Sequence, residues 1–206
     1  MKQKEYNIAI NWHYITVCII FAAAILLMVL YMPGFRETDS NILQALRNTF
    51  PTLPQFIPLL IQEIGRNCYL WPLIASGSVL VSHKYYLEAF LLVFFSQASH
   101  LLTKLIKDIV CRQRPCGEAY PGYSFPSHHA LAAMCFFGIL IYLSIKHAHG
   151  FWRYLLVTMF GILILLIGFS RLILGVHFPA DVLEGYLLGL ILVNLFIILD
   201  KFFNRN

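Results

Sequence analysis

Long apolar runs follow one another along most of the chain and leave few folds open to it. A transmembrane helix needs about 20 consecutive, mostly apolar residues. Six segments approach or reach that length: residues 14–32, 66–82, 85–106, 130–145, 154–172 and 182–199. Charged residues are only 12% of the 206, against about 25% in soluble domains. The sequence therefore predicts an all-α integral membrane protein, a single domain over residues 1–206 built as a bundle of six transmembrane helices.

The first apolar segment is followed by a stretch of mixed character. Lys2 and Lys4 precede the segment as in a signal peptide, but the run is longer than a typical signal core and no small-residue cleavage site follows. We expect an uncleaved anchor. Residues 33–65 hold four prolines, and the sequences at 41–50 and 54–65 predict short interfacial helices.

A six-span topology places the connections after the first, third and fifth spans on one face of the membrane. The polar clusters at 104–129 and 170–181 follow the third and fifth spans, so they are expected to meet there. Lys2 and Lys4 favour a cytoplasmic amino terminus under the positive-inside rule. Both termini are then cytoplasmic, and the two clusters lie on the opposite face.

The first polar cluster is the sequence KDIVCRQRP at 107–115. A separation of seven residues puts Lys107 and Arg114 on nearly the same face of a helix, about 10 Å apart. That face continues backwards as a polar stripe: Gln97, His100, Lys104, Lys107, Cys111 and Arg114. Polar groups at membrane depth are costly, so the stripe should face protein or a wet cavity. Contact with lipid head groups would explain the presence of Lys104 and Arg112, but it explains the whole stripe poorly. Pro115 is expected to end the helix.

Histidines mark the second and third clusters. PSHH at 126–129 carries His128 and His129, and SRLILGVHFPAD at 170–181 places His177 four residues before Asp181. In a helix this spacing brings imidazole and carboxylate to one face. A carboxylate there can fix the tautomer of the ring, although such a pair alone is more often a structural hydrogen bond.

Taken together, the clusters gather the cations Lys107, Arg114 and Arg171 around histidines. Cations that keep their charge suit a phosphate and its transition state. Acidic residues are too few to cage Mg²⁺. Three histidines (128, 129 and 177) match a zinc ligand count, but the cations would repel a dication. The net charge of +5 does not indicate nucleic-acid binding, because the cations lie beside apolar runs. We therefore expect no metal and no cofactor.

Three motifs carry a resemblance to a known family. K-x6-R-P (Lys107, Arg114, Pro115), P-S-x-H (Pro126, Ser127, His129) and S-R-x5-H-x3-D (Ser170, Arg171, His177, Asp181) occur in the order and with the spacing of the type 2 phosphatidic acid phosphatase (PAP2) family. The chain resembles the membrane-bound, lipid phosphatase branch of that family. A haloperoxidase, the family's other branch, is disfavoured because the motifs lie among membrane spans.

The resemblance implies a role for each motif residue. His177 would be the nucleophile that forms a phosphohistidine, and Asp181 would orient it. His129 would protonate the leaving oxygen and later activate water. The phosphate would be held by five residues: Lys107, Arg114, Ser127, His128 and Arg171. The resemblance also implies no metal requirement and a site on the non-cytoplasmic face, here of a bacterial inner membrane.

One position departs from the family pattern. The common family form has glycine where this chain has His128. Histidine keeps the backbone N–H that would help to bind phosphate but adds bulk and a titratable group. Its side chain either contacts a substrate head group or points aside, and we favour the second.

The five cysteines form no zinc-type pattern. Cys18 and Cys135 lie in apolar runs and are expected to be core thiols. A disulfide among Cys68, Cys111 and Cys116 would require that their side of the membrane be oxidising.

The leading functional hypothesis is a lipid phosphatase that cleaves a phosphomonoester or pyrophosphate through a phosphohistidine. The substrates that the resemblance suggests are undecaprenyl diphosphate, placed first, phosphatidylglycerol phosphate, phosphatidate and lipid A phosphate. The alternatives are a phosphotransferase that passes the phosphoryl group to another lipid and a non-catalytic lipid or anion transporter. Membrane lipids are the expected partners, and no obligate protein partner is indicated.

Overall fold

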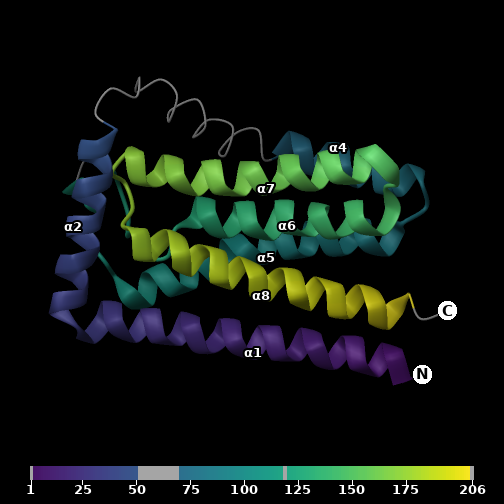
Figure 1. Ribbon diagram of the computed structural model, residues 1–206, viewed down its shortest axis with the longest axis horizontal. Helices are drawn as coiled ribbons and strands as arrows, with labels where there is room; N and C mark the ends of the chain where they lie inside the picture. The colour runs from purple at the N-terminus through teal and green to yellow at the C-terminus, as the bar shows by residue number, and fades with distance from the viewer. Residues whose placement is uncertain (1, 51–69, 118–119, 205–206) are drawn as a thin grey trace.

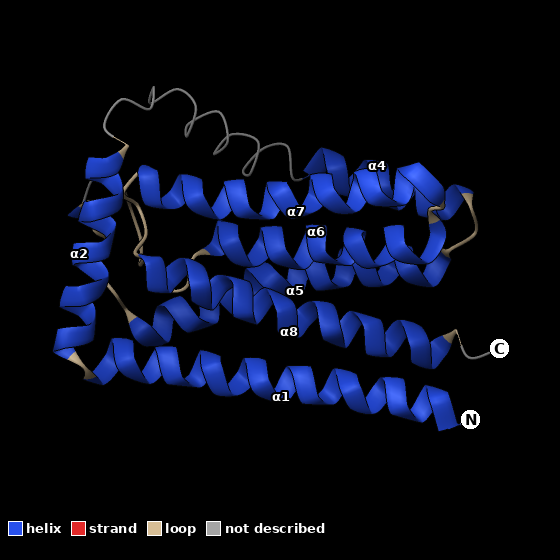
Figure 2. Cartoon of the chain, viewed as in Figure 1, coloured by secondary structure: helices blue, strands red, loops and turns tan. Residues whose placement is uncertain are grey.

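The computed structural model describes residues 2–50, 70–117 and 120–204, and all the regular elements in these ranges are α-helices (Figure 2). In chain order the helices are α1 (Lys2–Tyr31), α2 (Pro33–Thr49), α4 (Leu70–Ser82), α5 (Tyr86–Val110), α6 (His128–His147), α7 (Gly150–Ile173) and α8 (Pro179–Phe203). Most run along the long axis of the molecule, whereas α2 lies across one end (Figure 1). The all-α prediction is therefore confirmed for the described part of the chain.

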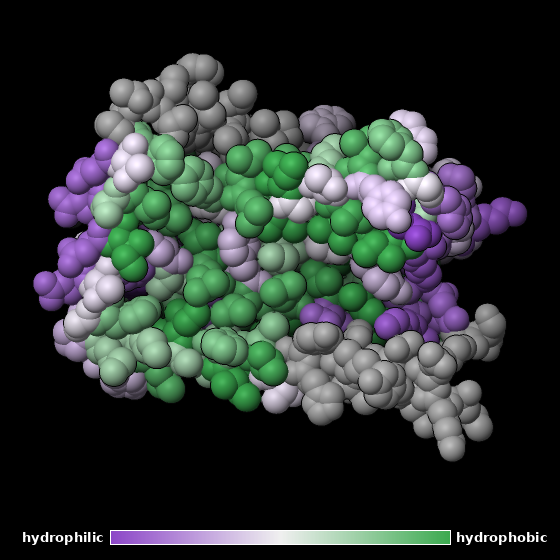
Figure 3. All heavy atoms as spheres, viewed as in Figure 1, coloured by the Kyte–Doolittle hydropathy of each residue, from purple (hydrophilic) through white to green (hydrophobic). Residues whose placement is uncertain are grey.

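Four helices, α5 to α8, are each long and apolar enough to cross a membrane. The segment Ile15–Tyr31 of α1 meets that test only together with α2, from which it is bent by 101°, and α4 is a shorter apolar helix. The described residues therefore contain four candidate spans, or five with the bent pair, and six spans are not confirmed. On the face drawn in Figure 3, apolar residues fill the middle of the molecule and hydrophilic ones gather towards its two ends.

Helix α2 replaces the short interfacial helix that the sequence predicts at 41–50. The helix has 17 residues and begins at Pro33, which occupies its first turn, where the missing N–H of proline costs nothing. Asp39 and Leu43 are its buried residues, one turn apart on a single face. The second predicted helix, at 54–65, lies outside the described residues.

The connections expected to share a face do so. Helix α2, the loop residues 111–117 and 120–127, and the loop at 174–178 meet at one end of the bundle, and both termini lie at the other end (Figure 1). Hydrogen bonds join the three elements: the Arg114 guanidinium donates to the Val176 carbonyl at 3.0 Å, and the Arg112 guanidinium donates to Asp39 of α2 at 2.8 Å. Residues that are far apart in the sequence are thereby gathered at one site.

Close approach of α8 to α6 depends on two glycines. A Cβ added at Gly185 would lie 2.7 Å from the Ser127 carbonyl oxygen, and one at Gly189 would lie 2.6 Å from Met134 Cβ. Contacts this short require that one helix move. The glycines therefore fix the distance between α8 and the beginning of α6.

We expect the Gly185→Ala variant to lower the free energy of unfolding by about 1–3 kcal/mol, the usual cost of overpacking. Thermal unfolding in detergent measures it. Gly161→Ala on α7 is the matched control, since a Cβ there meets nothing within 4 Å and alanine is the better helix former. A Gly185→Ala protein as stable as this control would show that α6 and α8 do not require the close contact.

At the end opposite the site, buried ion pairs join α5, α6 and α8. Lys146 Nζ lies 2.6 Å from both Glu88 Oε1 and Asp200 Oδ2, and His147 Nε2 lies 2.8 Å from Glu88 Oε2. The Tyr142 hydroxyl donates to Asp200 at 2.6 Å. Glu88 and Asp200 are only 2% and 1% exposed, so their charges need these partners.

Candidate active site

The predicted polar stripe does not continue to Arg114. Helix α5 ends at Val110, and Cys111 takes a left-handed conformation with φ of 50°, which turns the chain out of the helix. Arg114 instead reaches the site from the loop, where its Nε donates to the Gly122 carbonyl at 3.0 Å. The assumption of one continuous helix through residue 114 was wrong, because a residue in the left-handed region ends an α-helix.

Lys107 remains on α5, in the last turn of the helix. Its ammonium donates to the carbonyls of Tyr123 and Ser124, the latter at 3.3 Å. The Ser124 N–H in turn donates to the Arg112 carbonyl at 2.8 Å. The loop after α5 therefore folds back over the end of its own helix and brings Lys107 and Arg114 to the same place.

His177 lies in the loop between α7 and α8 and is 2% exposed. Its Nε2 is 3.2 Å from Nη1 of Arg114. Guanidinium groups only donate, so Nε2 must be the acceptor and the proton of the neutral ring is on Nδ1. Nδ1 faces Oδ2 of Asp181 at 3.5 Å, just beyond a normal hydrogen bond. The expected His–Asp pairing is present, although His177 precedes α8 instead of lying in it.

Burial determines the protonation state of this ring. It lowers the pKa of His177 to about 4, helped by the charges of Lys107 and Arg114 and opposed by Asp181. Burial also lowers the pKa of the Arg114 guanidinium, which still stays charged near pH 7. At neutral pH, His177 is thus an uncharged imidazole whose lone pair at Nε2 points to a cation.

Asp181 is completely buried and holds three parts of the site together. Its Oδ2 accepts the Phe178 N–H at 2.8 Å, and its Oδ1 accepts from Nη1 of Arg112 at 2.7 Å. Its backbone carbonyl accepts the Ser127 N–H at 2.9 Å. One residue therefore contacts the loop before α8, the start of α6 and the loop after α5.

Sequence reasoning missed Arg112 and Asp39. Arg112 was expected to reach lipid head groups, but it is buried, with Nη1 on Asp181 and Nη2 on Asp39 Oδ2 at 2.8 Å. Its guanidinium also stacks on the Phe178 ring, 4.0 Å from the centroid. The available signal was weak: an acidic residue on the apolar face of α2, one turn before Leu43.

The other predicted residues lie around His177. Arg171 is 2% exposed, and both its Nε and Nη2 donate to Ser170 Oγ at 3.1 Å. Four groups act electrostatically on the His129 imidazole: Arg171, His128, His177 and Arg114. Ser127 Oγ is buried and has no hydrogen-bond partner among the described residues. All the motif side chains thus converge on one centre.

His128 stands at the edge of this centre. Its Nδ1 is 3.4 Å from Thr103 Oγ1, and its ring packs against His100 with centroids 4.3 Å apart. Both of these contacts are with residues of α5.

The described residues also bear on a metal site and on disulfides. Among the described residues, no group of three or more His, Cys, Asp or Glu side chains is placed to hold a metal ion. Cys18, Cys111, Cys116 and Cys135 are free thiols. Cys68 lies outside the described residues.

Comparisons with known proteins agree with this arrangement. The PAP2 superfamily model matches residues 85–205. Phosphatidylglycerophosphatase B of Bacillus subtilis (strain 168) is 31% identical over 140 residues, which are 64% of this chain and 68% of that protein. A crystal structure described as the first transmembrane PAP2 type phosphatidylglycerolphosphate phosphatase from Bacillus subtilis superposes with a TM-score of 0.79, at 25% identity over 95% of this chain and 98% of the other. The chain therefore belongs to the PAP2 superfamily and has its membrane-embedded helical fold.

Proposed function

We propose that this protein is a membrane phosphatase that hydrolyses the terminal phosphomonoester of phosphatidylglycerol phosphate through a phosphohistidine on His177. The observation that carries the proposal is the state of the His177 ring. Its Nε2 is unprotonated and faces Arg114, while Nδ1 faces a buried carboxylate. A nucleophilic histidine requires this tautomer.

In the first step, the Nε2 lone pair attacks phosphorus and the bond from phosphorus to the ester oxygen breaks. His129 gives its proton to that oxygen, which leaves as the hydroxyl of phosphatidylglycerol. Lys107, Arg114 and Arg171 stabilise the charge on the phosphoryl oxygens, which is the main source of catalysis in phosphoryl transfer. Asp181 stabilises the positive charge that His177 gains on forming the P–N bond.

In the second step, water attacks the phosphohistidine. His129, now neutral, accepts a proton from the water as the P–N bond breaks, and inorganic phosphate is released with His177 again neutral. General acid–base help of this kind contributes about 10²- to 10⁴-fold. Each step uses residues of this chain alone.

The names of the two relatives favour phosphatidylglycerol phosphate as the substrate. Both are described as phosphatases of phosphatidylglycerol phosphate, whereas undecaprenyl diphosphate, the first choice from sequence, gains no support from them. We place the site on the extracytoplasmic face of a bacterial inner membrane with both termini in the cytoplasm. The positive-inside argument supports that orientation, and the termini share the end opposite the site.

The proposal predicts phosphate release from phosphatidylglycerol phosphate by purified protein in detergent micelles, at a rate unchanged by EDTA. Phosphatidate, undecaprenyl diphosphate and lipid A phosphate are tested in parallel, and we expect the first lipid to have the highest kcat/KM. Loss of activity in EDTA that added Mg²⁺ restores would contradict metal independence.

The same assay separates the alternatives. A phosphotransferase would give a new phosphorylated lipid on thin-layer analysis in place of inorganic phosphate. Transport of lipid across vesicles with no phosphate released would favour a transporter. Either result would replace the hydrolase that we propose.

A further inference from the structure

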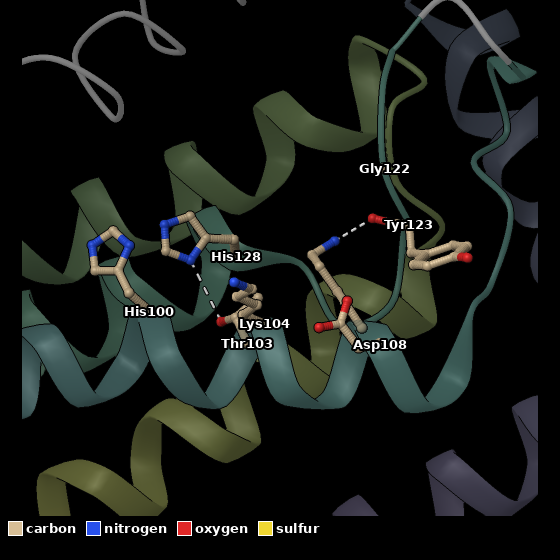
Figure 4. A pocket seen from close by; sticks show the side chains of 8 residues that line it. His100, Thr103, Lys104, Asp108, Gly122, Tyr123 and His128 are labelled. Carbon is tan, nitrogen blue, oxygen red and sulfur yellow. Dashed lines mark hydrogen bonds between the residues drawn. The ribbon is translucent and has the colours of Figure 1, made fainter.

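A cavity beside the reaction centre has not yet been given a role. It has a volume of about 380 Å³ and lies between α5, the beginning of α6 and residues 122–123 (Figure 4). We name it the side cavity and define it by His100, Thr103, Lys104, Lys107 and His128. Lys107 belongs both to this lining and to the reaction centre, so the two spaces are adjacent.

We propose that the side cavity binds the part of the substrate that joins the scissile phosphate to the acyl chains. This part is a glycerol with a free hydroxyl, followed by a phosphodiester. Lys104 would bind the phosphodiester, and His128 would accept a hydrogen bond from the glycerol hydroxyl. This subsite rests on the proposed function. It would make the enzyme select lipids with a glycerol-linked head group over lipids with a single phosphate.

The direction of the cavity fits such a ligand. Along α5, Lys104 lies about 4.5 Å and His100 about 10 Å from Lys107, measured from the rise per residue, and both lie on the side away from the helix end at Val110. A lipid whose terminal phosphate is at the reaction centre must extend towards the hydrocarbon. The group next to that phosphate therefore passes the side cavity.

The cost of an exposed charge also favours a ligand here. Lys104 is exposed on a helix that is apolar enough to span a membrane. A charged group at membrane depth is costly. A cavity that receives an anionic ligand gives the Lys104 ammonium a partner.

The hydrogen bonds of His128 indicate what its ring can recognise. Thr103 donates its hydroxyl hydrogen to the Ser99 carbonyl at 2.8 Å. Thr103 Oγ1 must then be the acceptor from Nδ1 of His128, 3.4 Å away (Figure 4). The neutral His128 ring is left with its lone pair on Nε2, which suits a hydroxyl donor. His100, packed against the ring at 4.3 Å, keeps the ring in place.

The charge in the lining suits an anion. Lys104 and Lys107 outnumber the single carboxylate, Asp108, which lies one turn beyond Lys104 on the Tyr123 side (Figure 4). Lys107 is engaged by the carbonyls of Tyr123 and Ser124. Lys104 has no hydrogen bond or ion pair with any described residue, so its ammonium is available to the phosphodiester.

The test varies the lipid and the protein together. Phosphatidylglycerol phosphate is compared with an analogue in which hydrogen replaces the central hydroxyl of the terminal glycerol. We expect wild-type kcat/KM to be about tenfold higher for the hydroxylated lipid, the value of one net hydrogen bond. His128→Phe, which keeps an aromatic ring against His100 but has no nitrogen, should lose this preference. A His128→Phe protein that still prefers the hydroxylated lipid would overturn the subsite.

A second variant tests the phosphodiester contact. Lys104→Gln should lower kcat/KM for phosphatidylglycerol phosphate about tenfold more than for phosphatidate, which has no phosphodiester. Lys84→Gln, exposed in the turn at the far end of the bundle, is the control and should leave the ratio unchanged. An equal loss on both lipids would overturn the subsite alone. Failure of the wild type to release phosphate from any of these lipids would overturn the proposed function as well.

Discussion

Phosphate release should fall at least about 10⁴-fold in a His177→Ala protein, to the background of the assay. In the mechanism that we propose, alanine removes the nucleophilic nitrogen, and without it the remaining groups can only orient the ester and stabilise charge. The variant should still fold, because the His177 ring makes only two polar contacts with described residues, namely the one with Arg114 at 3.2 Å and the one with Asp181 at 3.5 Å. Malachite-green detection of phosphate and a thermal-unfolding curve measure the two quantities.

Trapping of the phosphohistidine tests whether His177 is the residue that carries the phosphoryl group. With phosphate-labelled p-nitrophenyl phosphate, whose leaving group needs no general acid, a His129→Ala protein should retain acid-labile label, because it lacks the proposed base that activates water. No label should remain on His177→Ala. His83→Ala is the matched control, since His83 is exposed at the far end of the bundle, and it should behave as wild type. Full turnover by His177→Ala would show that the nucleophile is another residue.

The second large effect is expected at Arg112. Arg112→Ala leaves the buried carboxylates of Asp39 and Asp181 without their shared cation. Removal of one partner from a buried ion pair costs about 3–5 kcal/mol, and Asp181 then no longer holds a fixed position beside His177. We expect a lower unfolding temperature and a kcat reduced about 10²- to 10³-fold, with KM little changed. Steady-state kinetics well below the unfolding midpoint separates the two effects.

Conservative variants test the geometry of this network. Arg112→Lys keeps the charge but loses the fork that reaches two carboxylates at once, so it should recover stability better than activity. Asp39→Asn should lower kcat although Asp39 lies on α2, outside the three motifs. The exposed neighbours Glu37→Gln and Arg36→Ala serve as controls and should match wild type. Wild-type kcat in Asp39→Asn would show that α2 does not influence Asp181.

Much of this arrangement could be predicted because its signals are local. An apolar run of membrane length predicts a helix by itself, and α5 to α8 lie where the runs at 85–106, 130–145, 154–172 and 182–199 place them. The break at Pro33 and the start of α8 at Pro179 also follow from single residues. The motif residues converge because alternate connections share a face.

The parts that could not be predicted depend on contacts between distant residues. Arg112 and Asp39 are 73 positions apart, and no pattern within either segment indicates the pair. Helical periodicity assigned Arg114 to the face of Lys107. The left-handed conformation of Cys111, which ends the helix before Arg114, is not indicated by the residue type or by its neighbours in the sequence. A charged residue is predicted to lie at the surface when only its own segment is considered. Such a residue is buried when a residue of opposite charge from another element lies beside it, as Asp39 and Asp181 do for Arg112.

The ion pairs at the far end of the bundle bear on how the chain is made. Glu88 lies in the first turn of α5, and its partner Lys146 is synthesised 58 residues later. Until α6 is complete, a charged Glu88 has no cation to accompany it into the bilayer, and an unpaired charge there is costly. α5 and α6 should therefore enter the membrane together as a helical hairpin. Asp200, a further 54 residues on, then locks α8 onto that hairpin as the last step of assembly.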